Sequence, residues 1–584
     1  MLQAMVDNLP LDRRLNEDQS LFMLRFGDVL DTVYQEEHDL PPEKRSVYHL
    51  LLLGQGGSGK TYVVQNLIFP VVHFLWPPEA QRETLMVVAA KNSQAKNIST
   101  DEVRARTLHT AGCIRIQSLH NKDMTAGQND KLLQQRWSTI RVLIIEEISM
   151  VSAMLYNMLD YRAMLGRRLI FKVEPHTYTK VGAAFGRTPI VLHLGDFYQL
   201  RPTAQLSLIE DLERLDEDGQ HVHKDVPLEA QHAHDLFAAI PDVFELRGTK
   251  RFKPNDPLID ILQCMRTGQP FPEPLWNQLQ QRFVTDPQPG VADPRLDAPP
   301  FRSGYCMSLY WTSLVRMLYR RVISEATRLG KVLVMLQAAD TCLELDRAGC
   351  LRFLNQPNPH RTGLMHGIFP CYAGMQIRLL ARLDAEQGLV QDTVATIMDF
   401  ELHAADRDRY LTASPGDIFV PEYLPSGLWV SVKGYSGCAE FDDMMQLCRE
   451  HTNTEHAAQT LAKSFWFLPA EEVVVPYNKV EVRRCGFRIT HAQFLTSTAS
   501  QGLTLRDGTI IDCARQPEMD DDNWWLHLYV MLSRVTCLEH LLLMRPPPRE
   551  LLERGPPAAI KASMIEFACK ALRCREGIIA RHGK

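Results

Sequence analysis

The chain has 584 residues, of which 45% are hydrophobic and 23% charged, and its formal net charge is −6. These proportions are those of an ordinary globular protein, and a nucleic-acid partner would have to be held by local basic clusters. No apolar run reaches the ~18 residues of a membrane span. The 13 cysteines form no C-x-x-C pair that would indicate structural zinc. We therefore expect an intracellular protein with reduced thiols and no membrane contact, in a compartment that no clear targeting signal identifies.

The earliest element with a clear chemical role is a glycine-rich loop that fits the pattern G-x-x-x-x-G-K-[ST] in full. Residues 48–53 before it are typical of a buried strand, and residues 62–68 after it have helical spacing. Backbone N–H groups and a helix N-terminus converge on phosphate in this arrangement. The pattern predicts a nucleoside triphosphate site, in which Lys60 reaches the β- and γ-phosphates and Thr61 ligates Mg²⁺. The loop residues expected to contact the nucleotide are Gly54, Gly56, Gly57, Ser58, Gly59, Lys60 and Thr61.

Apolar strands and amphipathic stretches alternate over residues 15–205, which predicts an α/β fold with a parallel sheet between helices. We expect strands at residues 85–90, 142–145 and 190–194. The predicted boundaries are 1–208 for the first domain, with a small insertion at about 112–138; 209–245 for a linker; 246–364 and 486–548 for the two parts of a second α/β domain; 365–485 for an inserted β-rich domain; and 549–584 for a basic helical tail.

Acidic and amide side chains follow two of these strands. Glu146 and Glu147 come directly after residues 142–145, where a P-loop fold has one acid for Mg²⁺ and a second for the attacking water. Glu146 is the candidate metal ligand, although this position is normally Asp, and Glu147 is the candidate base. The other interpretation is a strand that leaves the core into a charged loop. Gln199 follows residues 190–194, where a glutamine can contact a γ-phosphate or position water.

Several stretches in the same order resemble the superfamily 1 DNA helicases of the Pif (petite integration frequency) and RecD-like group, from about residue 15 to about residue 545. The string similar to the family's G-D-F-x-Q-L is fairly specific, and the ordered set is stronger evidence than any single match. The stretches that carry the resemblance are Leu15-Asn16-Glu17-Asp18-Gln19, Lys91-Asn92-Ser93-Gln94-Ala95, Thr107-Leu108-His109-Thr110, Glu146-Glu147-Ile148-Ser149-Met150, Gly195-Asp196-Phe197-Tyr198-Gln199-Leu200, Lys250-Arg251, Ser500-Gln501-Gly502-Leu503-Thr504 and Tyr529-Val530-Met531-Leu532-Ser533-Arg534.

This resemblance implies two RecA-like domains with ATP in the cleft between them, and a small inserted SH3-like β-domain. It implies that Gln19 reads adenine and that Arg251 and Arg534 are arginine fingers in the second α/β unit, which meet ATP when the cleft closes. The implied enzyme is a monomeric helicase that uses ATP and Mg²⁺ to move 5′ to 3′ on single-stranded DNA and to unwind duplex or forked DNA. Such enzymes act in DNA repair, recombination and telomere maintenance, so the expected location is the nucleus or another DNA-containing compartment. Gly502 is the implied nucleotide contact of its motif, and the implied DNA contacts are Asn92, Ser93, His109, Ser500 and Gln501.

Three departures from the family's pattern leave other functions open. Glu146 replaces Asp, Ala499 replaces a Lys, and Arg251 is followed by Phe252 where the family usually has Gln. Loss of one phosphate contact weakens DNA binding, and it lowers the slope of log affinity against log salt concentration by about one unit. The alternatives are a catalytically weakened module that binds ATP and nucleic acid, and an RNA-directed motor of the same superfamily.

Two further features have ordinary explanations beside the functional ones. The H-x-H pairs at residues 221–223 and 232–234 could form a metal site or the His pair of a rolling-circle endonuclease, but a solvated loop explains them more simply. Trp524 and Trp525 could be a base-stacking platform or part of the core. The core is favoured, because the pair leads into the predicted helix that ends at Arg534.

Overall fold

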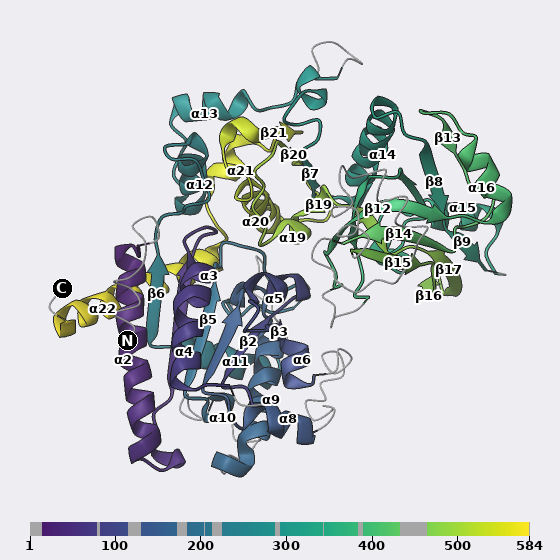
Figure 1. Ribbon diagram of the computed structural model, residues 1–584. Coiled ribbons are helices and arrows are strands. Elements are labelled where there is room, and N and C mark those ends of the chain that lie inside the picture. The colour runs from purple at the N-terminus through teal and green to yellow at the C-terminus, as the bar shows by residue number, and fades with distance from the viewer. Residues whose placement is uncertain are drawn as a thin grey trace, which may run out of the picture. The chain divides into compact units, whose positions relative to one another are not determined.

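The computed structural model describes residues 14–78, 82–114, 130–171, 184–203, 205–212, 225–285, 292–342, 344–383, 389–432 and 464–582. The chain forms two compact units (Figure 1). The first unit contains Met1–Leu275, Asp520–Cys537 and Pro548–Lys584, and the second contains Trp276–Met519 and Leu538–Pro547. No helix in the described ranges is long and apolar enough to cross a membrane.

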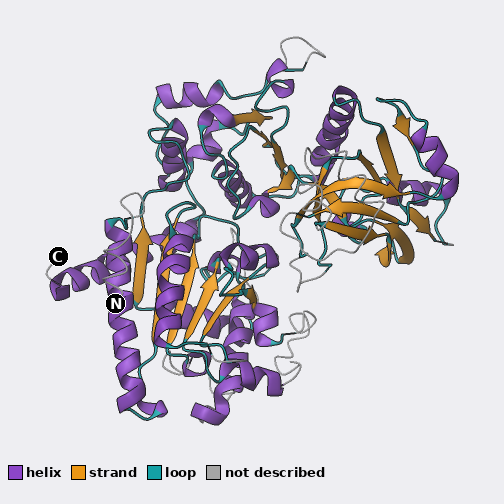
Figure 2. Ribbon diagram, viewed as in Figure 1, coloured by secondary structure: helices purple, strands orange, loops and turns teal. Residues whose placement is uncertain are grey.

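The first unit is built on a six-stranded parallel sheet with the strand order β3-β2-β4-β5-β1-β6 (Figure 2). The predicted strands at residues 48–53, 85–90, 142–145 and 190–194 are confirmed, and each observed strand ends within one residue of its prediction. These strands are apolar on both faces because helices cover both sides of the sheet. The strands are β1 (Tyr48–Gly54), β2 (Leu85–Ala89), β3 (Arg106–Thr107), β4 (Val142–Glu146), β5 (Ile190–Gly195) and β6 (Asp242–Leu246).

The helix after the glycine loop continues further than residue 68. A π-helical turn, η3 (Val64–Ile68), joins α3 to α4, and Pro70 lies in the first turn of α4, where a missing N–H is tolerated. The helices of the first unit are α2 (Glu17–Asp39), α3 (Lys60–Val63), α4 (Phe69–Leu75), α5 (Asn92–Ile98), α6 (Leu108–Gly112), α8 (Asp130–Trp137), α9 (Ala153–Phe171), α10 (Ala184–Arg187), α11 (Leu228–Ala238), α12 (Pro257–Thr267), α20 (Asp521–Leu532), α21 (Arg549–Glu553) and α22 (Ala558–His582), with the short turns η2 (Pro42–Lys44) and η4 (Ile148–Met150).

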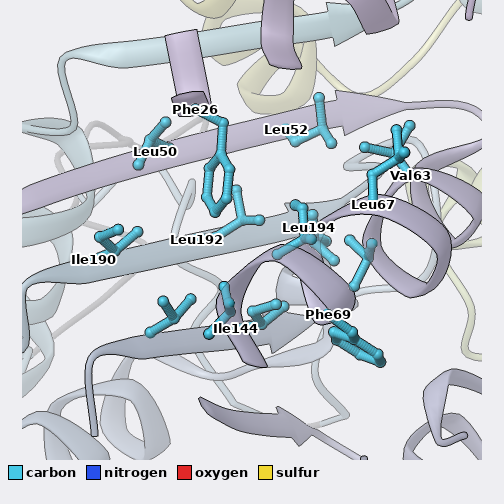
Figure 3. Packing of buried hydrophobic residues seen from close by; sticks show 14 of the residues in the cluster. Phe26, Leu50, Leu52, Val63, Leu67, Phe69, Ile144, Ile190, Leu192 and Leu194 are labelled. Atoms are coloured by element: carbon cyan, nitrogen blue, oxygen red, sulfur yellow. The ribbon is translucent and has the colours of Figure 1, made fainter. Parts of the chain in front are cut away.

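The main core of the first unit lies on one face of this sheet, where α2 and the helical stretch α3–α4 cover the strands (Figure 3). Phe26 of α2 packs over Leu50 and Leu192, and Leu67 and Phe69 of the helical stretch belong to the same buried cluster. This packing holds the carboxyl end of β1 in place, and the glycine loop starts there.

The second unit contains a four-stranded parallel sheet with the order β19-β7-β20-β21, on which α14 packs. Three further sheets, with the orders β10-β8-β13, β15-β14-β12-β11-β18 and β16-β17-β9, form the predicted β-rich region. The SH3-like form of this region stays a prediction. The strands are β7 (Tyr305–Ser308), β8 (Leu333–Gln337), β9 (Ala339–Thr341), β10 (Ile368–Cys371), β11 (Gln376–Leu379), β12 (Val394–Glu401), β13 (Ile418–Phe419), β14 (Gly427–Ser431), β15 (Phe465–Pro469), β16 (Glu471–Tyr477), β17 (Val480–Gly486), β18 (Ile489–His491), β19 (Phe494–Thr496), β20 (Thr509–Asp512) and β21 (Leu541–Met544).

Helices and short turns complete the second unit. They are α14 (Trp311–Arg328), α15 (Arg347–Leu354), α16 (Ala404–Leu411), α19 (Ser497–Ser500), η6 (Pro294–Asp297), η7 (Pro359–Arg361) and η8 (Leu538–His540), while α13 (Glu273–Gln280) runs across the boundary of the units.

The observed division differs from the predicted domain boundaries. Residues 246–275 and Asp520–Cys537 were expected in the second α/β domain, yet they belong to the first unit. The physical reason is that α12 packs against α20, and the segment before α12 hydrogen-bonds to the glycine loop: the Lys250 N–H donates to the carbonyl of Gly57 at 2.9 Å. Strands β8 and β9 also pair with the β-rich sheets, although they precede residue 365.

A buried arginine connects α9 to the chain segments around α8 and α10 in the first unit. Arg167 on α9 has no exposed surface, and its guanidinium donates to the carbonyls of Gly186, Trp137 and Ile140 at 2.7–2.8 Å. Burial lowers its pKa to about 9, which is still high enough to keep it charged near neutral pH. We expect Arg167→Met to destabilise the protein by about 2–4 kcal/mol, because three buried carbonyls lose their donor.

The measurement is the melting temperature of the full chain by differential scanning fluorimetry. Arg168→Met is the matched control, since this neighbouring side chain is exposed. Equal melting temperatures for the two variants would contradict the structural role of Arg167.

Candidate functional site

The glycine loop between β1 and α3 has a backbone that needs its glycines. Gly57 and Gly59 have φ angles of 85° and 94°, a region that other residues rarely adopt. A Cβ atom on Gly57 would lie 2.6 Å from the Thr249 hydroxyl oxygen, and one on Gly56 would overlap the Arg251 guanidinium. The loop is therefore shaped both by its own turns and by the segment that packs on it.

The predicted adenine-reading residue, Gln19, contacts this loop directly. It forms a capping box with Asn16 at the start of α2: the Gln19 N–H donates to Asn16 Oδ1 at 2.8 Å, and the Asn16 N–H donates to Gln19 Oε1 at 3.0 Å. Its side-chain Nε2 donates to the carbonyl of Ser58 at 3.0 Å. Gln19 thus ties the first turn of α2 to the glycine loop.

The segment after β6 approaches the loop from another side. The Thr249 hydroxyl donates to the carbonyl of Gly56 at 2.9 Å. Arg251, which follows, donates through Nη1 to the carbonyl of Ser533 at 2.9 Å. Arg251 therefore lies in the same compact unit as the glycine loop, whereas the resemblance implied a place in a second α/β unit.

Arg534 also belongs to the first unit, at the end of α20, and only 1% of its surface is exposed. Its guanidinium donates to the carbonyl of Val530 at 3.0 Å and to the Ser533 hydroxyl at 2.8 Å. Burial lowers the pKa of Arg534, and burial together with the nearby charge of Arg534 lowers the pKa of Arg251 to about 9. A buried arginine and a half-buried arginine are thus held close together, which is costly unless negative charge lies near them.

The acids that lie near these arginines are at the end of β4. Glu146 is buried and Glu147 is half-buried, and their burial raises the pKa of both carboxyl groups. The two acids repel each other, so Glu147 raises the pKa of Glu146 further, while the Lys60 ammonium opposes both shifts. Arg534 and Arg251 also stabilise the Glu147 carboxylate. Glu147 has a φ of 52°, a left-handed conformation that non-glycine residues rarely adopt.

Several buried polar atoms around the loop have no hydrogen-bond partner in the described part of the chain. Such atoms are uncommon in folded proteins unless a ligand or water satisfies them. Phosphate oxygens, a hydrated Mg²⁺ and an attacking water together supply the acceptors and donors that this set lacks, so the residues fit Mg²⁺ and ATP. The atoms are Ser58 Oγ, Glu146 Oε2, Glu147 Oε2, Gln199 Oε1 and Arg251 Nε.

An arginine that the sequence did not single out as a site residue lies beside this set. The Arg266 guanidinium stacks 3.9 Å from the Tyr198 ring centroid, donates to the Tyr529 hydroxyl at 3.0 Å and lies 3.6 Å from Asp196. Burial would lower the pKa of Arg266, but Tyr529 and Asp196 outweigh it and raise this pKa. Arg266 links the strand end before Gln199 to α20.

The predicted DNA contacts fall into both units. In the first unit, Asn92 and Ser93 begin α5, and His109 lies on α6, where burial lowers its pKa. Its Nε2 atom is buried without a partner among the described residues. In the second unit, Ser500 ends α19 and Gln501 has both amide atoms buried without a partner in the described ranges.

Gly502 follows in the second unit with a φ of 83°. Its role as a nucleotide contact stays a prediction.

The remaining sequence features have structural roles. The His residues at 232 and 234 lie on helix α11 rather than in a loop, and those at 221 and 223 lie outside the described residues. No cluster of metal ligands occurs among the residues that the structure describes. Trp525 is fully buried and stacks on Tyr529 at 5.3 Å, which confirms the core interpretation for this residue.

Comparison with known proteins gives a family match and several structural matches. Residues 30–210 match the family model of the PIF1-like helicases. The chain is also similar to a crystal structure of Pif1 helicase from Candida albicans, with 18% identity, a TM-score of 0.51, and coverage of 95% of this chain and 99% of that one. Comparison with curated proteins finds no significant match.

Two further structures are similar in fold. One is Pif1 helicase from Bacteroides in complex with ADP-AlF3 and ssDNA (14% identity, TM-score 0.51, covering 92% of this chain and 95% of that one). The other is a structure on DNA unwinding at forked dsDNA by two coordinating Pif1 helicases (14% identity, TM-score 0.52, covering 95% and 98%). The architecture of this chain matches the two RecA-like domains of Pif1 helicases.

The role of Glu146 can be tested by changing the length of its side chain. If Glu146 holds Mg²⁺, Glu146→Asp keeps or raises the rate of ATP hydrolysis, because it restores the usual ligand, and Glu146→Ala lowers the rate by about 10²-fold or more. The measurement is steady-state phosphate release at saturating Mg²⁺. Equal rates for wild type and both variants would remove Glu146 from the site.

Proposed function

From the PIF1-like helicase match of residues 30–210, we propose that this chain is an ATP-dependent DNA helicase that moves 5′ to 3′ on single-stranded DNA and unwinds duplex or forked DNA. The observation that carries the proposal is the set of buried, oppositely charged side chains around the glycine loop. Glu146 and Glu147, at the carboxyl end of β4, both lie within electrostatic reach of Lys60, and Glu147 also lies within reach of Arg251 and Arg534. A donor set of this kind suits phosphoryl transfer, in which positive charge must stabilise the leaving γ-phosphate.

Each side chain has a role in this proposal. Lys60 and the loop N–H groups bind the phosphates, and Thr61 and Glu146 hold Mg²⁺, which neutralises phosphate charge when bound. Glu147 accepts a proton from the attacking water, which Gln199 orients.

The two arginines supply charge at the γ-phosphate. Their pKa values are lowered by burial, so a bound triphosphate gains more from them than from exposed arginines. Arg251 is hydrogen-bonded to the backbone carbonyl of Ser533, next to Arg534, so the positions of the two guanidinium groups are coupled.

The nucleic-acid partner is proposed from the relatives and from the chain's own residues. A similar structure holds ssDNA, and another concerns forked dsDNA. The proposed DNA contacts are Asn92, Ser93 and His109 in the first unit, and Ser500 and Gln501 in the second. The 5′-to-3′ direction and action as a monomer follow the family resemblance.

A weakened ATP-binding module remains the second candidate, because Glu146 replaces Asp and Ala499 replaces a Lys. An RNA-directed motor is the third, since the same phosphate contacts can bind either nucleic acid.

Stimulation by DNA tests the main proposal. We expect single-stranded DNA to raise the rate of ATP hydrolysis at least tenfold, and Lys60→Ala to abolish hydrolysis, because the loop loses its cation at the phosphates. Lys44→Ala is the matched control, since this exposed lysine lies away from the loop on η2. Phosphate release is measured with DNA and with RNA of equal length. No stimulation by DNA would contradict the proposal, and stimulation by RNA alone would favour the RNA motor.

The missing lysine gives a separate prediction. Ala499→Lys restores one phosphate contact, so the slope of log affinity against log salt becomes steeper by about 0.7 for single-stranded DNA. Fluorescence anisotropy at several salt concentrations measures this slope. An unchanged slope would show that residue 499 does not contact the DNA backbone.

A further inference from the structure

The long helix α22 lies beside β6 and α2 in the first unit (Figure 1). Arg575 of α22 contacts Asp18 at 3.2 Å and also pairs with Glu17, both in the first turn of α2. Further along, Arg581 pairs with Asp28 at 3.2 Å. Charged contacts therefore attach α22 to α2 at two separate places, one close to the glycine loop and one farther from it.

The Asp18 carboxylate is where three chain segments meet. It accepts from the backbone N–H of Arg247 at 3.1 Å and from the Arg247 guanidinium at 3.1 and 2.6 Å, in addition to Arg575. Burial would raise the pKa of Asp18, but the hydrogen bonds from Arg247 outweigh burial and lower this pKa. The carboxylate is thus charged near neutral pH and holds two arginines at once.

Two short paths lead from this carboxylate to the glycine loop. The next residue, Gln19, donates to the carbonyl of Ser58 at 3.0 Å. Arg247 begins the segment in which Thr249 donates to the carbonyl of Gly56 at 2.9 Å. A displacement of the first turn of α2 would therefore move both supports of the loop.

The same helix also contacts the other side of the site. The Phe567 ring of α22 stacks on Phe197 at 5.7 Å and meets Phe237 edge-on at 6.1 Å. Phe197 lies in the turn between Asp196 and Gln199. The Gln199 N–H closes this turn by donating to the carbonyl of Asp196 at 3.0 Å. One helix thus supports both the adenine side and the γ-phosphate side of the proposed nucleotide site.

We infer that α22 is a positioning element of the nucleotide site, in which Arg575 holds Asp18 so that Gln19 stays against the glycine loop. This inference rests on the proposed function, because it takes ATP as the ligand of the loop. Arg575 donates to α2 rather than to the loop, so it acts on the affinity for nucleotide and leaves the hydrolysis step to the residues already described.

The experiment measures the Kd of a fluorescent ATP analogue without DNA, and then the KM for ATP and kcat with single-stranded DNA. Arg575→Ala is expected to raise Kd and KM about threefold, the size of effect that one partly exposed ion pair supports, with kcat changed less than twofold. Asp18→Ala is expected to raise them about tenfold, because Arg247 also loses its partner. Arg575→Lys is expected to restore most of the affinity.

Arg581→Ala is the matched control, since it removes a pair between the same two helices at the end of α22, away from the loop. Its Kd is expected to equal that of the wild type. Equal Kd values for Arg575→Ala and the wild type would overturn the inference and leave the proposed function intact. Equal increases in Kd for Arg575→Ala and Arg581→Ala would also overturn the inference, since weaker docking of α22 as a whole would then explain both changes. A wild type that binds no nucleotide would overturn the proposed function itself.

Discussion

Burial of opposite charges around one loop is the constraint on which the rest of the first unit depends. Glu146 and Glu147 end a buried strand, and Arg251 and Arg534 are brought beside them from distant parts of the sequence. None of these charges is stable when buried alone. The parallel sheet places both acids at its carboxyl edge beside the glycine loop, and α20 with the segment after β6 supplies the cations. The fold of the first unit and the arrangement of its site thus follow from the same requirement, that each buried charge has an opposite charge beside it.

The supports of the loop form an outer layer around this charged set. Gln19 and Thr249 hold the loop carbonyls, and Asp18 connects both supports to α22. On the opposite side, Arg266 contacts both Asp196, in the turn that carries Gln199, and Tyr529 of α20. Arg266 thereby attaches this turn to α20. A nucleotide bound here would therefore affect the positions of helices that do not touch it. In a motor protein, such helices can transmit the structural change caused by hydrolysis to a DNA-binding surface.

Local patterns in the sequence predicted much of this structure. The strands at β1, β2, β4 and β5 follow from their apolar runs, and the glycine loop follows from its fixed spacing. The grouping of Arg251 and Arg534 with the loop does not follow from local patterns, because it depends on contacts between residues hundreds of positions apart; only the family resemblance indicated that both arginines meet the nucleotide. The roles of Arg266 and Arg575 were missed for the same reason: a single charged residue on a helix has no periodic signal that shows its partner.

The most direct test of this account is the change in melting temperature on binding a non-hydrolysable ATP analogue with Mg²⁺. Binding to the folded state alone stabilises it, and a ligand at about 100 times its Kd adds about 2.7 kcal/mol. The account predicts a clear rise in melting temperature for the wild type with nucleotide and Mg²⁺ together, and little or no rise for Lys60→Ala. The same small change in both proteins would contradict the claim that these buried charges form a nucleotide site.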